Sequence, residues 1–170
     1  MPDFTYAEVG ATQHEPLPDR YNHLRHRTLI GEGADVFARA AQAVLTFGMH
    51  RAAGARIDSA ADRAAPGVRL TVTFGPFTVP CEVVYAYDEP GRAGFGYGTL
   101  PGHQERGEEA FFVDHDALGR VWFTVKAFSL PARWPAVVGG PLTVLFQRAF
   151  ARRLGRSLKR LSPASRTVGS

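Results

Sequence analysis

The chain has 170 residues, of which 45% are hydrophobic, and it carries a formal net charge of +4. This composition is that of one soluble domain, so we expect a single domain over residues 1–170, with its core at about 4–161 and a disordered tail at 162–170. The single cysteine, Cys81, excludes a disulfide scaffold and a cysteine-rich zinc site. It indicates a reducing, cytoplasmic location, in which Cys81 serves as a small buried hydrophobe.

The charge is distributed unevenly along the chain. Residues 1–116 hold 10 Arg against 16 Asp and Glu, a net of −6, whereas residues 117–170 hold 10 Lys and Arg and no acid, a net of +10. Asp3 lies where a signal peptide needs a basic region. The uncharged segment 134–146 has 13 residues, and a membrane-spanning helix needs about 20. Neither secretion nor a membrane span is expected.

The first periodic segments predict a strand and then a helix. Residues 24–30 alternate weakly and end at a Gly-Glu-Gly connection, which indicates a strand followed by a tight turn. From Val36 onward the apolar residues recur at helical spacing, with Glu32 and Asp35 near the positive end of the helix dipole. We expect this helix to end at Gly54.

Residues 66–130 predict an antiparallel meander, because period-2 runs are separated by turns too short for a crossover helix. One run places five residues on one predicted face: Val79, Cys81, Val83, Tyr85 and Tyr87. The next run places Gly94, Gly96 and Gly98 on one face of a strand. Because glycine weakens a strand, we expect something to approach this face closely.

The C-terminal segment predicts a short helix and then a long amphipathic helix. Ser129 is expected to cap the short helix, which opens with Pro131 and is broken at residues 139–141. Beyond the break, an apolar stripe and a basic face run along a helix of about five turns. The stripe consists of Leu142, Phe146, Phe150, Leu154, Leu158 and Leu161, and the basic face of Arg148, Arg152, Arg156 and Lys159.

The order of strand, helix, meander and long helix resembles the helix-grip architecture of START-like and birch-pollen-allergen-like proteins. Three runs are more specific: Tyr21–Arg27, Met49–Gly54 and Tyr97–Phe111. Through these runs, nearly the whole chain resembles a domain-of-unknown-function family of bacteria and plants. The resemblance implies an α+β helix-grip fold, in which a curved antiparallel sheet of six or seven strands wraps around a long C-terminal helix. It implies no catalytic residue, because this scaffold serves several functions.

A sheet that grips a helix leaves a wedge-shaped space, which is a small-molecule pocket when aromatic side chains line it. We therefore expect the partner to be a small apolar or amphipathic molecule, such as a lipid. Plain core packing of the same side chains is the alternative. The candidate lining residues are Phe74, Tyr85, Phe95, Tyr97, Phe111, Phe123, Leu142, Phe146 and Phe150.

One imidazole and three carboxylates gather within seven residues: His103, Glu105, Glu108 and Glu109. Glu109 shares a predicted strand face with Phe111, so burial there would raise its pKa and allow Glu109, or His103, to act as a general acid or base. The same two residues are candidates for ligand recognition. A hydrolase, isomerase or cyclase is therefore the alternative to a binding protein. A purely structural role would pair Glu109 with Arg25 or Arg27 and leave the other two carboxylates solvated.

Other kinds of chemistry have less support. His103, Glu105, Asp114 and His115 offer metal-ligating atoms, but their spacing matches no metal-site template, so no metal and no other cofactor is predicted. The sequence has neither a nucleophile elbow nor a phosphate-binding loop. The basic C-terminal face can lie in water, contact an anionic membrane or bind nucleic acid. A solvated face is the main expectation, since cations near a helix C-terminus also have an ordinary structural role, and nucleic acid is the least expected partner.

Overall fold

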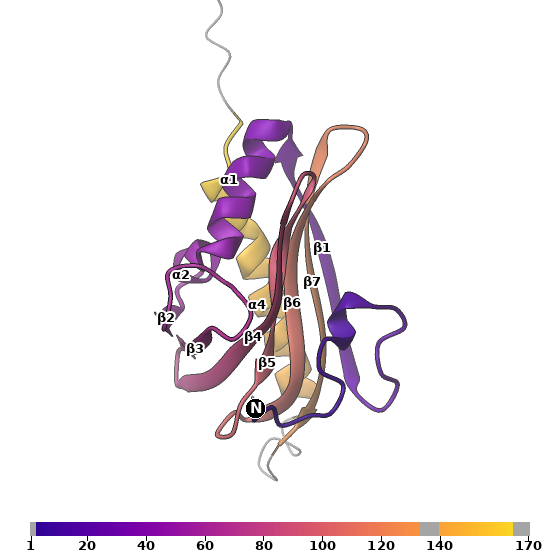
Figure 1. Cartoon of the computed structure of the whole chain (residues 1–170), viewed down its shortest axis with the longest axis vertical. Coiled ribbons are helices and arrows are strands. Elements are labelled where there is room, and N and C mark those ends of the chain that lie inside the picture. Colours follow the sequence, from indigo (N-terminus) through magenta and orange to yellow (C-terminus); the bar gives the residue numbers. More distant parts are fainter. Residues whose placement is uncertain (1–2, 133–139, 165–170) are drawn as a thin grey trace, which may run out of the picture.

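The computed structural model describes residues 3–132 and 140–164, which form one 3-10 helix, seven strands and three α-helices (Figure 1). The strands are β1 (Asn22–Glu32), β2 (Arg56–Ser59), β3 (Arg69–Phe74), β4 (Phe77–Glu89), β5 (Arg92–Thr99), β6 (Glu105–His115) and β7 (Arg120–Pro131). The helices are η1 (Ala11–Gln13), α1 (Ala34–Leu45), α2 (Gly48–Ala52) and α4 (Gly140–Leu161).

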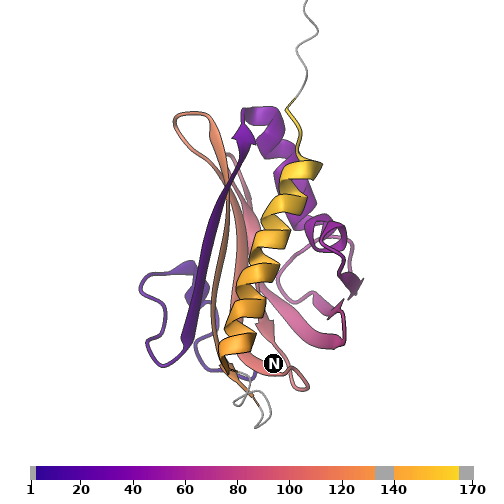
Figure 2. The same cartoon turned by 180° about the vertical axis from the view of Figure 1, so that it is seen from behind.

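The seven strands form one sheet in the order β1-β7-β6-β5-β4-β3-β2, and every neighbouring pair is antiparallel. The sheet curves around α4, and α1 and α2 lie on the same concave side (Figures 1 and 2). α4 contacts β1, α1 and α2. This arrangement confirms the predicted α+β helix-grip fold.

The single helix predicted from Val36 to Gly54 is in fact two helices. Phe47 adopts a left-handed backbone conformation, with φ of 60°, between the end of α1 and the start of α2. Its ring is fully buried and packs edge-to-face on Phe95, with ring centroids 5.4 Å apart. Tertiary packing therefore holds a backbone conformation that a bulky residue rarely adopts. The apolar spacing continues across this break, so periodicity alone predicted one helix.

A β-bulge in β4 changes the face on which two tyrosines lie. Before the bulge, Val83 pairs with Tyr97 of β5, as the alternating pattern requires. After the bulge, Tyr85 pairs with Gly96, so the side chains beyond this point exchange faces. Tyr85 and Tyr87 consequently lie on the convex face of the sheet, although the sequence pattern placed them with Val83 on the concave face.

The N-terminal segment, residues 3–21, lies against the convex face (Figure 1). Gly98 of β5 leaves room for its approach, and Gly96 leaves room for the ring of Tyr85 in β4. A β-carbon on Gly96 would lie 2.5 Å from the Tyr85 ring, and one on Gly98 would lie 2.2 Å from Tyr6 Oη. Both distances are far shorter than van der Waals contact. The close approach predicted from the glycine pattern is therefore confirmed, and Tyr85 and Tyr6 are its cause.

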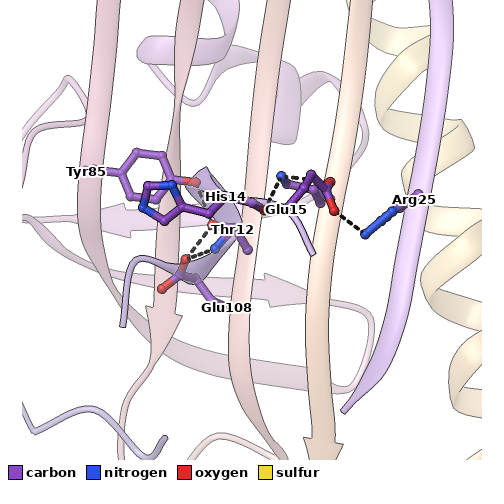
Figure 3. A network of polar contacts seen from close by, with 7 residues as sticks. Thr12, His14, Glu15, Arg25, Tyr85 and Glu108 are labelled. Atoms are coloured by element: carbon purple, nitrogen blue, oxygen red, sulfur yellow. Dashed lines mark hydrogen bonds and ion pairs between the residues drawn. The ribbon is translucent and has the colours of Figure 1, made fainter. Parts of the chain in front are cut away.

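A buried carboxylate anchors the N-terminal segment. Glu108 is only 2% exposed. It accepts hydrogen bonds from Tyr6 Oη at 2.6 Å, from the Gly10 N–H at 2.7 Å, and from both the N–H, at 3.0 Å, and the hydroxyl of Thr12. The Thr12 hydroxyl is also hydrogen-bonded to Tyr85 Oη at 2.5 Å (Figure 3). These donors stabilise a buried charge that has no cationic partner among the described residues.

The chain between β7 and α4 differs in part from its prediction. β7 continues to Pro131, and Ser129 pairs with Asn22 of β1, so Ser129 is a strand residue and not a helix cap. The remainder of the predicted short helix falls on residues 133–139, outside the described residues. The long C-terminal helix is present as α4. Within the described residues, no helix is both long and apolar enough to cross a membrane.

The residues directly after α4 pack against the domain. Ser162 is buried, and Arg39 of α1 donates a hydrogen bond to the Pro163 carbonyl. A disordered tail was predicted from residue 162, but Ser162 and Pro163 have defined contacts. The rest of that predicted tail, residues 165–170, lies outside the described residues.

Candidate functional site

A cavity of about 440 Å³ lies between the concave face of the sheet and α4. Small-molecule sites have volumes in this range. Its apolar lining comes from Val72, Phe74, Phe77, Val79, Tyr97, Ala127, Phe146 and Phe150. Its polar lining includes Thr99, His103, Gln104, Glu105, Glu109, Ser129 and Gln147.

Six of the ten residues predicted to bind ligand line this cavity: Phe74, Tyr97, His103, Glu109, Phe146 and Phe150. The other four lie elsewhere. Phe95, Phe111 and Phe123 are fully buried in the core, so they fill space beside the helices and do not border the cavity. Tyr85 belongs to a separate cluster on the convex face. The side chain of Leu142 lies outside the described residues.

Aromatic rings from a hairpin and a helix form the apolar wall of the cavity. Phe146 and Phe150 are four residues apart on α4 and therefore lie on one helix face. The ring centroid of Phe74 in β3 lies 5.8 Å from that of Phe146 and 4.8 Å from that of Phe150. Phe77, which opens β4, lies 5.4 Å from Phe146. The wall thus depends on both the β3–β4 hairpin and the first half of α4.

Glu109 supplies a carboxyl group to the polar part of the cavity. It lies on the same concave face of β6 as Phe111, as the alternating pattern predicted. Tyr97 Oη donates a hydrogen bond to Glu109 Oε2 at 3.1 Å. Burial raises the pKa of Glu109 to about 7; the charge of Glu105 also raises this pKa, and the Tyr97 hydrogen bond lowers it. Glu109 is therefore poised to change its protonation state near neutral pH.

The pairing of Glu109 with Arg25 or Arg27, considered as its structural role, is wrong. Arg25 forms an ion pair with Glu15 at 2.7 Å, and the Arg27 guanidinium lies 4.2 Å from the centre of the Trp122 ring. Neither arginine pairs with Glu109. The expectation that Glu108 is solvated is also wrong, because its carboxylate is enclosed by the N-terminal segment.

His103 and Glu105 form a second polar group at the cavity. The Glu105 N–H donates to His103 Nδ1 at 2.9 Å, so the proton of a neutral imidazole lies on Nε2. Burial lowers the pKa of His103 to about 4, which leaves the ring neutral at pH 7. Gln147 Nε2 donates to Glu105 Oε2 at 2.7 Å and so connects α4 to β6, while burial raises the pKa of Glu105. His103 therefore offers the cavity an imidazole N–H donor, and Glu105 adds a second carboxyl group beside Glu109.

Other reactive groups do not gather at the cavity. In residues 3–132 and 140–164, no three or more His, Cys, Asp or Glu side chains are arranged to hold a metal ion. Cys81 is fully buried, and burial raises its pKa well above the usual range. Its thiol is consequently unsuited to act as a nucleophile.

Several lining residues were not predicted from the sequence, and two of them, Phe77 and Gln147, make contacts across the cavity wall. Phe77 pairs with Phe74 across the hairpin turn, so the register of that turn was a signal that could have identified it. Gln147 follows Phe146 on α4 and reaches the cavity because of the position of the helix against β6. No local pattern in the sequence indicates that position.

Comparison with known proteins places the chain in a family. Residues 5–157 match the family model described as Domain of unknown function (DUF1990). A UPF0548 protein of Deinococcus radiodurans is 37% identical over 170 residues, which cover 92% of this chain and 86% of the relative. This match confirms the resemblance stated from the three sequence runs.

Two solved structures show the same fold at low sequence identity. A hypothetical protein of Helicobacter pylori has a TM-score of 0.74 at 11% identity, covering 96% of this chain and 98% of its own. Norcoclaurine synthase of Thalictrum flavum, in complex with dopamine and hydroxybenzaldehyde, has a TM-score of 0.58 at 12% identity, covering 82% and 85%. Together with the match over residues 5–157, these findings lead to one assignment: the chain belongs to the DUF1990 family and has the helix-grip fold.

Proposed function

We propose that the protein binds a small amphipathic molecule in the cavity between the sheet and α4. The observation that carries this proposal is an aromatic cavity of about 440 Å³ whose polar part holds Glu109, a carboxyl group with a pKa of about 7. The apolar body of the ligand packs against Phe146 and Phe150. Its polar end meets Glu109 and the Nε2–H of His103.

The charges around the cavity favour one kind of polar end. Glu105 and Glu109 line the cavity, and its described lining residues include no Lys or Arg. A fatty-acid carboxylate would face these carboxyl groups without a compensating cation. A hydroxyl or an amine, by contrast, can donate a hydrogen bond to Glu109. The proposed ligand is therefore an apolar alcohol, phenol or amine and not a fatty acid.

Calorimetry with three probes of one shape tests this proposal. The probes share an alkylphenyl body and end in an amine, a hydroxyl or a carboxylate. At neutral pH we expect the first two to bind at least about tenfold more tightly than the carboxylate. Glu109→Gln should reduce the difference in affinity between the carboxylate probe and the other two, because it removes the titrating carboxyl group. Phe150→Trp should weaken all three probes, because the larger ring occupies the cavity.

Tyr85→Phe is the matched control, since Tyr85 is an aromatic residue on the convex face of the same sheet. Its binding constants should equal those of the wild type. Absence of binding by all three probes, together with no ligand retained in native mass spectra of protein purified from its own host, would refute the proposal.

Acid/base catalysis on a bound molecule is a second candidate function. A pKa of about 7 is near the optimum for a general acid or base at neutral pH. Norcoclaurine synthase, which has a similar fold, has been solved with two small aromatic molecules bound. The similarity extends to the fold alone, so the support for this candidate comes from Glu109 itself.

The pH profile of turnover distinguishes the second candidate from simple binding. For any probe that the protein converts, the rate should depend on a group with an apparent pKa near 7, and Glu109→Gln should abolish turnover while retaining binding. Tyr97→Phe should move the apparent pKa upward, because the Tyr97 hydrogen bond lowers the pKa of Glu109. A profile that is unchanged in both variants would exclude Glu109 as the acid or base.

A further inference from the structure

The exposed face of α4 carries a strip of positive charge. Its six cationic side chains are all exposed: Arg148, Arg152, Arg153, Arg156, Lys159 and Arg160. The helix contains no Asp or Glu. Among the described residues, no ion pair includes a cation of this helix. The acidic half of the chain therefore leaves this strip uncompensated.

Exposed apolar side chains adjoin the strip where α4 borders the cavity. Leu145 is 62% exposed, Phe146 42% and Phe77 37%. The rings of Phe77 and Phe146 are in contact, and both also line the cavity. We call these three residues the apolar rim. Leu145 lies three and seven residues before Arg148 and Arg152, so it shares their helix face. A rim of large apolar side chains beside cations that form no ion pair among the described residues is unusual for a surface that faces only water.

We propose that the rim and the basic strip dock onto an anionic phospholipid bilayer. In this arrangement, the rim enters the boundary between headgroups and acyl chains, and the cations of α4 lie against the phosphates and anionic headgroups. The most exposed member of the rim is Leu145, an aliphatic residue. It gains free energy on leaving water, but it has no ring to stack on a nucleic-acid base. The combination of features therefore favours a bilayer over nucleic acid.

Docking in this orientation turns the cavity toward the bilayer, because Phe77 and Phe146 belong to both surfaces. If the proposed ligand-binding function holds, an apolar ligand can exchange between cavity and membrane without crossing water. The docking itself does not depend on that function, since it uses residues that lie outside the cavity as well.

Cosedimentation with phosphatidylcholine vesicles, with and without phosphatidylserine, tests the proposal. We expect binding to the phosphatidylserine vesicles only, weakening as salt rises. Each cation near an anionic surface contributes roughly a fivefold factor, so Arg148→Gln/Arg152→Gln should weaken binding about 30-fold. Arg27→Gln/Arg106→Gln is the matched control, because both residues are exposed and Arg27 stacks on the other side of the sheet. It removes the same net charge and should leave binding unchanged.

Leu145→Gln tests insertion of the rim. Its side chain is exposed and is not among the lining residues of the described cavity, so the variant should fold and bind cavity probes as the wild type does, yet lose vesicle binding even at low salt. Equal losses in the two arginine double variants would show that only net charge matters and would overturn the proposal. The proposal would also be overturned if Leu145→Gln bound vesicles as the wild type does, or if the wild type did not bind vesicles at low salt. Binding to single-stranded oligonucleotides without binding to vesicles would overturn it as well.

Discussion

Glu109→Gln should make the protein more stable at neutral and alkaline pH. Burial raises the pKa of Glu109 from 4.5 to about 7 in the folded protein. Because the unfolded chain ionises this group at lower pH, its contribution to folding is fully present below about pH 4.5 and is lost as the pH rises through about 7. The interval between these pKa values corresponds to about 3 kcal/mol. Glutamine stays neutral throughout, so the variant avoids this loss.

Urea unfolding of both proteins, from about pH 5 to about pH 8, measures the effect as a difference in the free energy of unfolding. The difference cancels the titration of His103, which is common to both chains. It should grow by about 2–3 kcal/mol in favour of the variant as pH rises. Glu89→Gln, which removes an exposed carboxylate, is the control and should show no such trend. A difference that stays constant over this range would refute the placement of Glu109 in a desolvated cavity.

Three further substitutions test other parts of the structure. Glu108→Ala leaves the buried donors of Tyr6, Gly10 and Thr12 unpaired, so it should lower the free energy of unfolding by about 3–5 kcal/mol and expose the N-terminal segment to proteases; unchanged stability would contradict the anchoring role. His50→Leu should stabilise the protein by about 1–2 kcal/mol at pH 7, because neither buried ring nitrogen has a partner among the described residues. The gain in stability should increase as the pH falls below about 6.5, because burial lowers the pKa of His50 to about 3 while the unfolded chain takes up a proton. A gain that becomes smaller in acid would contradict the burial of a neutral His50. Gly98→Ala should cost about 1–3 kcal/mol in thermal or urea unfolding, because the new methyl group would collide with Tyr6.

Periodicity predicted most of the fold. The alternating runs and the helical stripe specify which side chains face the core, and this information is sufficient for the meander and for α4. It does not reveal where a backbone changes register. The bulge between Val83 and Tyr85 depends on pairing with β5, so the sequence pattern could not show that Tyr85 crosses to the convex face. The break at Phe47 likewise depends on its packing against Phe95.

The residues of the candidate site that could be predicted are those whose pattern lies within one short stretch of sequence. Glu109 and His103 were identified because they lie close together in the sequence and because Glu109 shares a predicted strand face with Phe111. Glu108, by contrast, is held by residues that precede it by about 100 positions, and residues 3–21 have no periodic pattern that indicates their partner. Only the glycines of β5 indicated that something lies on the convex face, and they could not identify it.

The pairing of β1 with β7 has a consequence for synthesis on the ribosome. β1 is made before the other six strands, but its sole partner in the described sheet is the last of them, and the anchor of the N-terminal segment lies in β6. The N-terminal segment and β1 therefore lack these native contacts until β6 and β7 have emerged from the ribosome. A chain that stops before Arg120 would leave β1 as an unpaired edge and α1 without the completed sheet. The native sheet can therefore be completed only after β7 has been made.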